Sequence, residues 1–226
     1  MFRLMQITRA QVILITLATF AGLISFMVVA SAQDDAAETP TPPALSGTTA
    51  EAVFAGGCFW CVESDFDKVP GVLETTSGYA GGTLPNPTYK QVTYENTGHY
   101  EAVKVVYDPQ TVSYSELVEY FWRHIDPTDD GGQFCDRGAS YRTAIFAASS
   151  DERDIAEASK AAIDASGVLR SPIVTPILDA GQFWDAEGYH QDYYKKNPVR
   201  YELYRTGCRR DATVRRVWAG EQDADG

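Results

Sequence analysis

The chain has 226 residues, of which 44% are hydrophobic and 22% are charged, and its formal net charge is −12 at pH 7. This length allows one domain of ordinary size with a buried hydrophobic core. The acidic charge argues against nucleic acid or an anionic lipid surface as the partner, because both are themselves negatively charged. The charge by itself indicates only solubility.

The first 32 residues are typical of an export signal. Arg3 and Arg9 give a positive start, residues 12–30 are almost entirely apolar, and residues 30–32 have the small-residue pattern that signal peptidase cleaves. The apolar run approaches the ~20 residues that cross a bilayer, so an uncleaved membrane anchor is the alternative interpretation. Both interpretations predict that the rest of the chain is exported, with the periplasm as the expected compartment.

The remainder of the chain divides into a linker, one domain and a tail. Residues 33–50 are rich in Pro, Thr, Ala and acidic residues, and they predict a disordered linker because they cannot bury enough apolar surface to fold. Residues 51–218 predict a single domain without internal repeats. Residues 219–226 predict a short flexible tail.

The segment around Cys58 predicts a strand followed by a helix. The run AVFAGG is apolar and ends in two glycines, as a strand entering a tight turn does. The next residues have apolar side chains at helical spacing until Pro70, so we expect a helix that begins at Cys58. The free N–H groups and the positive dipole at a helix start stabilise a thiolate. Cys58 is therefore a candidate reactive thiol, and Cys61 lies one turn further along.

The next predicted elements are a glycine-rich loop over residues 78–92 and a strand after it. Alternation along this strand puts Glu101 on one face with Val103, Val105 and Tyr107. If this face is buried, the loss of hydration raises the pKa of the Glu101 carboxyl. If the strand start is solvated instead, Glu101 is an ordinary surface acid.

The central part of the chain predicts two capped helices. Ser113 and Glu116 form a capping-box pattern at the start of an amphipathic helix. A second glycine-rich loop follows, and then the strand YRTAIFAA. Residues 149–167 predict a helix that stops at Gly167.

The last part of the chain contains two prolines that limit its elements. Pro176 lies inside the strand pattern PIVTPIL and predicts an edge strand or a bulge. Pro198 predicts the end of a short helix, and Cys208 follows in a basic segment that we expect to be loosely held. Strands and helices that do not alternate regularly predict an α+β fold.

The chain has four cysteines, Cys58, Cys61, Cys135 and Cys208. In an oxidising compartment an even number suggests structural disulfides, so a non-enzymatic binding domain fixed by two disulfides is one hypothesis. Only one close pair exists, so the spacing matches no common zinc pattern and we expect no metal.

The C-x-x-C motif suggests a second hypothesis, a thiol-disulfide oxidoreductase that uses Cys58 and Cys61. Such pairs usually enclose small residues or proline, whereas Phe59 and Trp60 form an apolar patch beside the thiolate. This patch suits a methyl or thioether group better than a partner disulfide. The alternative is that both rings pack in the core.

The three histidines leave two further alternatives open. A hydrolase-like dyad of Cys58 with His99 is compatible with the sequence spacing. His99, Glu101 and His190 could together form a metal site. Each histidine, including His124, could equally be a structural side chain with satisfied hydrogen bonds.

An ordered series of segments between residues 52 and 218 resembles peptide methionine sulfoxide reductases of the A type. In chain order the segments are GGCFWCVE, GYAGG, NPTY, TGHYEAV, VVYDP, FWRHIDP, QFCDRGASYRTAIF, YHQDYYKKNP and YRTGCRRD. Each segment alone is a weak signal, but the ordered set is specific. The resemblance implies a two-layer α+β sandwich with a mixed sheet and a ferredoxin-like core.

The resemblance also implies roles for individual residues. Cys58 matches the nucleophile, and Phe59 and Trp60 match the apolar wall that receives the substrate methyl group. Glu101 matches the acid that protonates the sulfoxide oxygen. Tyr89 and Tyr141 match the hydroxyl donors to that oxygen. Asp136 matches the residue that helps to order substrate and active-site water. The family acts on methionine sulfoxide, free or in proteins, with preference for the S epimer. The resemblance implies no bound cofactor, and we expect a monomer.

The chemistry agrees with these assignments. A thiolate can attack the sulfoxide sulfur only if the oxygen is protonated as it leaves, which requires an acid still protonated near neutral pH. The attack leaves Cys58 as a sulfenic acid, a second thiol condenses with it to a disulfide, and an external thioredoxin-like dithiol reduces that disulfide.

Three cysteines are candidates for the second, resolving thiol. Cys208 is our first candidate, because Arg209 and Arg210 beside it favour a thiolate. Cys61 is the second candidate because it lies one helical turn from the nucleophile, and Cys135 is the third because it precedes Asp136.

Overall fold

The computed structural model describes residues 48–222. The predicted export signal, almost all of the predicted linker and the last four residues of the predicted tail lie outside the described residues. Within this part of the chain, no helix combines the length and the apolar character that crossing a bilayer requires.

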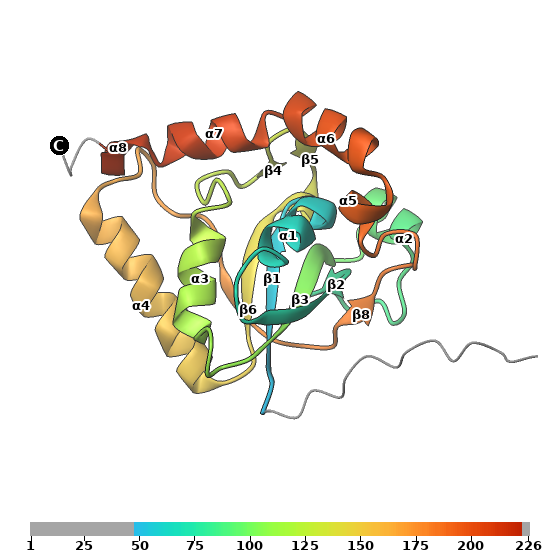
Figure 1. The fold of residues 1–226 in the computed structure, drawn as a ribbon, viewed down its shortest axis with the longest axis horizontal. Coiled ribbons are helices and arrows are strands. Elements are labelled where there is room, and N and C mark those ends of the chain that lie inside the picture. Colours follow the sequence, from blue (N-terminus) through green and yellow to red (C-terminus); the bar gives the residue numbers. More distant parts are fainter. Residues whose placement is uncertain (1–47, 223–226) are drawn as a thin grey trace, which may run out of the picture. The chain divides into compact units, whose positions relative to one another are not determined.

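A six-stranded mixed sheet organises the domain, with the strand order β7-β6-β1-β3-β2-β8 (Figure 1). The strands are β1 (Ala50–Gly56), β2 (Val72–Ala80), β3 (Tyr100–Tyr107), β6 (Thr143–Ala147), β7 (Ile177–Asp179) and β8 (Trp184–Asp185). Neighbouring strands run antiparallel except β6 and β7, which are parallel. The inner order β6-β1-β3-β2 is that of a ferredoxin-like core. In this order β3 lies between β1 and β2, the two strands that the helix over Phe59–Phe66 connects. The predicted α+β fold is therefore confirmed.

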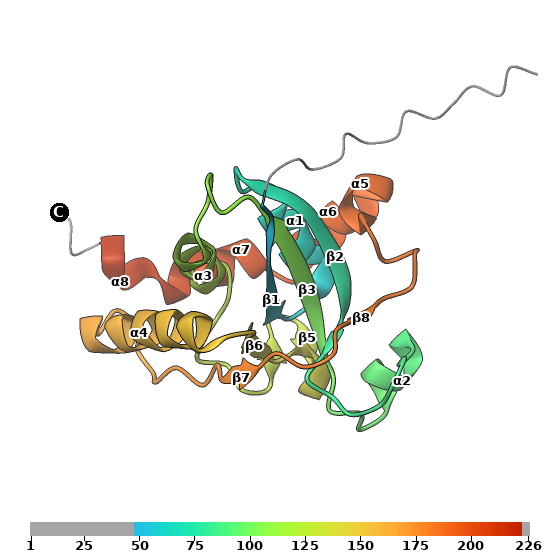
Figure 2. The same ribbon diagram turned by 90° about the horizontal axis from the view of Figure 1, so that it is seen from below.

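The helices lie mainly on one face of this sheet (Figure 2). They are α1 (Phe59–Phe66), α2 (Tyr89–Tyr94), α3 (Tyr114–Trp122), α4 (Ser150–Ser166), α5 (Tyr193–Lys196), α6 (Pro198–Gly207), α7 (Arg210–Val217) and α8 (Ala219–Gln222). Helices α1 and α3 pack on the sheet, and α4 packs beside α3. A small hairpin of β4 (Gly132–Gln133) and β5 (Asp136–Arg137) and a 3₁₀ turn η1 (Ala139–Tyr141) lie between α3 and β6 in the chain.

Aromatic side chains fill the layer between the helices and the sheet. The ring centroid of Phe54 on β1 lies 4.9 Å from that of Phe66 on α1 and 5.1 Å from that of Phe121 on α3. All three side chains are buried, and full burial of such a side chain stabilises a fold by about 2–3 kcal/mol. This packing fixes α1, and with it Cys58 at its N-cap, against the central strands.

Helix ends follow the sequence signals closely. The Ser113 hydroxyl accepts a hydrogen bond from the Glu116 backbone N–H, and the Glu116 carboxylate accepts from the Ser113 N–H, so the predicted capping box is present. Helix α4 ends at Gly167, whose φ of 68° is the left-handed conformation that glycine adopts most easily. Both predictions are confirmed.

The C-terminal part departs from the sequence-based expectations. The predicted short helix is present as α5, which ends directly before Pro198, and Pro198 also occupies the first turn of a further helix, α6, that was not expected. Cys208 is the C-cap of α6 rather than part of a loosely held segment, because α6 and α7 dock on the rest of the domain. Pro176 precedes β7, which is an edge strand as predicted. The loop expected at 78–92 contains the end of β2 and helix α2.

Candidate active site

Cys58 occupies the N-cap position of α1, at the end of a tight turn from β1. The turn requires glycine at position 57, where φ is 84° and an added Cβ would lie 2.6 Å from Cβ of Gln133. The backbone carbonyl of Cys58 accepts hydrogen bonds from the N–H groups of Cys61 and Val62. Cys58 thus lies at the helix start that the sequence predicts, and its side chain is buried.

Cys58 and Cys61 are free thiols that share a hydrogen bond. Burial raises the pKa of Cys58 well above its ordinary value, and the neighbouring Cys61 and Glu101 add to the increase. Burial thus favours the thiol form of Cys58 in the substrate-free site, so a thiolate there needs a partner that takes its proton. The pKa of Cys61 is lowered by the hydrogen bond from Cys58, against burial, with the positive charges of Arg210 and Arg205 contributing.

Glu101 on β3 lies directly against the start of α1. Its Oε2 accepts a hydrogen bond of 3.0 Å from the backbone N–H of Phe59, and its side chain is 1% exposed. Burial raises the pKa of Glu101 to about 8, with Asp136 adding to the increase while the Phe59 bond opposes it. Of the two alternatives for this face, the structure shows the buried one, and at pH 7 the protonated form of Glu101 predominates.

Two tyrosine hydroxyls adjoin this acid. Tyr141 on η1 is hydrogen-bonded to Glu101, and Tyr89 at the start of α2 is hydrogen-bonded to Tyr141. The backbone N–H of Tyr89 donates to Glu187 Oε1 over 2.9 Å, and the hydroxyl of Tyr79 donates to Glu187 Oε2 over 2.9 Å. Glu187 therefore positions Tyr89, a role that no sequence signal indicated.

The apolar side of the site is built around Trp60. Its indole stacks on Tyr193 of α5 with a ring separation of 3.7 Å and an interplanar angle of 6°. Its Nε1–H donates to Nδ1 of His190 over 3.0 Å. The ring of Phe59 lies 4.8 Å from His190, which also contacts Tyr89 at 4.6 Å. Burial lowers the pKa of His190, so this histidine is neutral and orients the aromatic wall.

Tyr204 on α6 is a site residue that the sequence analysis missed. Its hydroxyl donates a short hydrogen bond to Oδ2 of Asp136 on β5, and it is also hydrogen-bonded to the Cys58 sulfur. Burial raises the pKa of Asp136, while the bond from Tyr204 opposes that increase. Only tertiary docking brings α6 to Cys58, so no local pattern could have identified Tyr204.

The other two cysteines form a disulfide, Cys135–Cys208, with Cα atoms 4.9 Å apart. The bond joins the β4–β5 hairpin to the end of α6, the two elements that carry Asp136 and Tyr204. Within the described residues, the only candidate group of metal ligands combines these two sulfurs with Asp136. Because the sulfurs are bonded to each other, they are not available as thiolate ligands.

A buried charge cluster supports the site from behind. Arg210 donates to the carbonyl oxygens of Gly56 and His124 over 3.1 and 2.9 Å, and its Nε lies 3.6 Å from Asp65 Oδ2. Arg205 Nη1 lies 2.8 Å from Asp65 Oδ1. Arg210 thereby holds the backbone that immediately precedes the nucleophile turn.

The histidine alternatives receive no support from the contacts. Both ring nitrogens of His99 are engaged with backbone, Nδ1 accepting from Gly82 N–H and Nε2 donating to Leu84 O. His124 Nδ1 contacts the carbonyl of Tyr120. Neither ring has a hydrogen bond to Cys58 among the described residues, and His99, Glu101 and His190 do not converge as a ligand group there.

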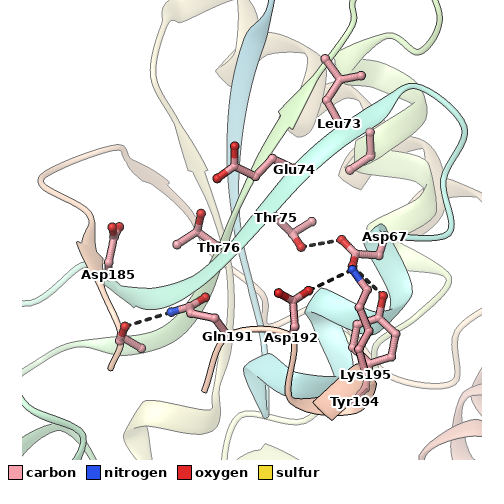
Figure 3. A pocket seen from close by; sticks show the side chains of 12 residues that line it. Asp67, Leu73, Glu74, Thr75, Thr76, Asp185, Gln191, Asp192, Tyr194 and Lys195 are labelled. Carbon is pink, nitrogen blue, oxygen red and sulfur yellow. Dashed lines mark hydrogen bonds and ion pairs between the residues drawn. The ribbon is translucent and has the colours of Figure 1, made fainter. Parts of the chain in front are cut away.

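A separate cavity of about 550 Å³ lies between β2, β8 and α5 (Figure 3). Asp67 lines this cavity, accepts hydrogen bonds from Thr75 and Tyr194 over 2.5 and 2.6 Å and pairs with Lys195 at 2.7 Å. None of the predicted catalytic residues lines this cavity. This cavity is therefore distinct from the Cys58 site. The hydrogen bond from Tyr194 to Asp67 in it is of the same kind as the bond from Tyr204 to Asp136, so Tyr194 offers a control for substitutions at Tyr204.

Comparisons with known proteins identify the family. The family model described as "Peptide methionine sulfoxide reductase" matches residues 50–222. The chain belongs to this family. Peptide methionine sulfoxide reductases are oxidoreductases, so the chain is an enzyme of that class, and the resemblance in the sequence motifs is confirmed.

Individual relatives agree across most of the domain. The chain is 56% identical over 176 residues to peptide methionine sulfoxide reductase MsrA 2 of Rhizobium meliloti, covering 78% of this chain and 87% of the relative. It is 51% identical over 170 residues to MsrA of Bacillus subtilis, covering 75% and 96%.

Solved structures of the family share the fold. Methionine sulfoxide reductase A of Corynebacterium diphtheriae has a TM-score of 0.59 at 39% identity, covering 67% of this chain and 76% of that one. Mxr1 of Saccharomyces cerevisiae in its reduced form has a TM-score of 0.60 at 32% identity, covering 66% and 86%.

Proposed function

We propose that the chain reduces methionine S-sulfoxide, free or in proteins, to methionine, with Cys58 as the nucleophile. The observation that carries this proposal is the contact between the start of α1 and Glu101, a carboxylic acid with a pKa of about 8. A protonated acid next to a cysteine and an aromatic wall suits a substrate with an S–O bond and a methyl group. Thiol-disulfide exchange breaks no S–O bond and so needs no acid that protonates an oxygen.

The reaction converts one thiol and one sulfoxide into one sulfenic acid and one thioether, and the Glu101 proton given to the oxygen is replaced through solvent by the proton that leaves the Cys58 thiol. Cys58 sulfur attacks the sulfoxide sulfur while Glu101 gives its proton to the sulfoxide oxygen, with Tyr141 and Tyr89 as hydrogen-bond donors. The oxygen ends on Cys58 as a sulfenic acid, and methionine leaves. Phe59 and Trp60 receive the methyl group, and Asp136 contributes to ordering of substrate and water.

Cys61 is the resolving thiol in our proposal. The sequence favours Cys208, but Cys208 is bonded to Cys135, whereas Cys61 is hydrogen-bonded to Cys58. The lowered pKa of Cys61, held down by that bond and by Arg210 and Arg205, suits attack on the sulfenic sulfur. Condensation releases water and forms a Cys58–Cys61 disulfide. An external dithiol of the thioredoxin type then reduces this disulfide by exchange.

The activity is tested with the S and R epimers of a blocked methionine sulfoxide and dithiothreitol as the reductant. We expect turnover of the S epimer only, and complete loss of turnover in Cys58→Ser. Turnover of neither epimer, or activity that survives in Cys58→Ser, contradicts the proposal.

The resolving thiol is tested by peptide mapping after one turnover without reductant. We expect a Cys58–Cys61 disulfide with Cys135–Cys208 unchanged, and we expect Cys208→Ser to retain thioredoxin-driven turnover. A Cys58–Cys208 disulfide, with loss of recycling in Cys208→Ser, restores the order that the sequence favours.

The compartment is also part of the proposal. The positive start and apolar run of residues 1–32 support export, so that the enzyme repairs oxidised methionine in exported proteins with an exported thioredoxin-like donor. Mass analysis of the mature N-terminus tests this, because cleavage after Ala32 gives a chain that begins at Gln33. An intact N-terminus in the membrane fraction supports the anchor instead, and an intact N-terminus in the cytoplasm contradicts export.

A further inference from the structure

The hydroxyl of Tyr204 lies between two groups that can exchange a proton. It donates its hydrogen bond to Oδ2 of Asp136 and is hydrogen-bonded to the Cys58 sulfur. A phenol has one proton to donate and can accept at its oxygen. Because the proton of Tyr204 points to Asp136, its oxygen can accept the single thiol proton of Cys58 in place of Cys61, the other acceptor beside Cys58.

We propose that Tyr204 is a catalytic residue that relays the thiol proton of Cys58 to Asp136. The proton on Cys58 Sγ moves to Tyr204 Oη, and the proton of Tyr204 moves to Asp136 Oδ2. The products are a Cys58 thiolate, an intact Tyr204 phenol that now donates to this thiolate, and a protonated Asp136. No hydrogen bond is lost, because each bond in the chain only reverses its direction.

This relay separates the acid of the reaction from its base. Glu101 gives a proton to the sulfoxide oxygen, and Asp136 receives the proton that leaves Cys58, so the two carboxyl groups exchange protonation states during one turnover. Solvent then returns both to their starting states. The relay also resolves a difficulty in the resting site, where burial holds Cys58 as a thiol and a proton acceptor is needed to activate it.

The geometry of the relay is fixed from both sides. Asp136 lies on β5 next to Cys135, Tyr204 lies on α6 one turn before Cys208, and the Cys135–Cys208 disulfide joins these two segments. The carboxylate and the phenol are both partly buried. A partly buried carboxylate with a raised pKa is a better proton acceptor than a solvated one.

Other titratable groups surround the relay and enter its pH dependence. The groups that face Cys58, Tyr204 and Asp136 from neighbouring elements are Cys61 on α1, Tyr89 on α2, Glu101 on β3, Tyr141 on η1, Arg205 on α6 and Arg210 on α7. Cys61 is the one competing acceptor for the Cys58 proton, because it shares a hydrogen bond with Cys58 and has a lowered pKa. The test is therefore made in a Cys61→Ser background.

The test uses the full chain with Cys61→Ser, in which Cys58 is the one cysteine outside the Cys135–Cys208 disulfide. The first readout is the rate of single-turnover sulfoxide reduction to the Cys58 sulfenic acid between pH 6 and pH 10. We expect Tyr204→Phe to lower this rate about 100-fold at pH 7, the range of general base catalysis. The deficit should shrink as pH rises, because hydroxide replaces the relay.

The second readout is alkylation of Cys58 by iodoacetamide, followed by mass spectrometry, which needs no sulfoxide reduction. We expect Tyr204→Phe to slow alkylation about tenfold at pH 7, since loss of a hydrogen bond to the thiolate raises the pKa of Cys58 further and leaves less thiolate. Asp136→Asn should show the same pH-dependent deficit, because an amide can accept the Tyr204 hydrogen bond but cannot take its proton. Tyr194→Phe, which removes the matching hydroxyl bond of 2.6 Å to Asp67, should behave as the background.

The inference rests on Cys58 as the nucleophile of the proposed function, but the two fail separately. Absence of sulfoxide reduction in the parent enzyme overturns the proposed function, whereas alkylation still tests the relay. A wild-type rate in Tyr204→Phe, a deficit equal at every pH, or an unchanged pH profile in Asp136→Asn overturns the relay and assigns Tyr204 to packing.

Discussion

The backbone N–H of Phe59 donates a 3.0 Å hydrogen bond to the carboxyl of Glu101, so the acid and the first turn of the nucleophile's helix form one unit. Strand β3 places the acid, helix α1 places the thiol, and this bond keeps the two in register. The apolar core beneath α1 makes the contact possible, and the same core desolvates the acid.

Activity should fall as pH rises through the pKa of Glu101. The reaction needs the protonated acid, whose pKa is raised to about 8 by burial, so turnover should decline above about pH 8. Glu101→Gln should lower kcat by about 100-fold or more at pH 7, because an amide cannot give its proton to the sulfoxide oxygen. Stopped-flow single turnovers from pH 6 to pH 10 measure both effects. Unchanged turnover in Glu101→Gln would assign the proton to another donor.

The same residue should make the fold less stable at high pH. The folded-state pKa of Glu101 lies above its value of 4.5 in an ordinary carboxyl, so the folded state binds the extra proton between about pH 4.5 and pH 8. The free energy of unfolding therefore falls as pH rises through this window, by up to about 4–5 kcal/mol. Glu101→Gln should be more stable than the parent at pH 9 and equal to it near pH 4. Urea titrations at the two pH values measure this difference.

Trp60→Phe should weaken substrate binding more than it slows the chemistry. Phenylalanine can keep the stack on Tyr193 but loses the 3.0 Å bond to His190 that sets the angle of the wall. Loss of one hydrogen bond of about 1 kcal/mol corresponds to a several-fold increase in KM with kcat nearly unchanged. The control is Trp184→Phe at the edge strand β8, for which steady-state kinetics should give the parent's KM. A fall in kcat at constant KM in Trp60→Phe argues against a binding role.

Arg210→Met should destabilise the domain by about 3–5 kcal/mol, because it leaves Asp65 with one fewer partner in a buried position. It also removes two hydrogen bonds to the carbonyls of Gly56 and His124. The double variant Arg210→Met, Asp65→Asn should recover part of the loss, since the buried charge is gone. Denaturant midpoints of the two single variants and the double variant measure the coupling, and strictly additive losses would show that the two side chains do not interact.

Removal of the Cys135–Cys208 disulfide should lower the free energy of unfolding by about 4 kcal/mol, because the bond closes a loop with a sequence separation of 73. Cys135→Ser with Cys208→Ser measures this cost without strong reductant. Parent enzyme reduced with dithiothreitol should unfold at the same denaturant concentration as the double variant. Equal stability of the oxidised parent and the double variant would show that the bond is not formed in solution.

Local patterns predicted the parts of this fold that local forces decide. The capping box at Ser113 and the stop at Gly167 follow from side chains a few positions apart. Alternation showed which side chains share a face with Glu101, and the packing of the domain decides that this face is buried. The ordered motifs then identified the family, because they extend over nearly the whole domain.

Contacts between distant segments were not predictable in this way. Pro198 marks both the end of α5 and the start of α6, and only the end of α5 was predicted, because the docking of α6 on the domain is not a local property. Tyr204 meets Asp136, which lies 68 positions earlier in the chain. Burial by distant elements also raises the pKa of Cys58, and no local pattern indicates the extent of that burial.

The position of Arg210 has a consequence for the order in which the enzyme is assembled. The turn that presents Cys58 is held by a side chain that follows it by 154 residues, and the phenol that contacts its sulfur is also among the last residues of the domain. During synthesis the first thiols therefore emerge from the ribosome long before the groups that complete their site. A nascent or prematurely terminated chain contains Cys58 but lacks Tyr204 and Arg210, so the completed reductase centre forms only after the final helices have docked.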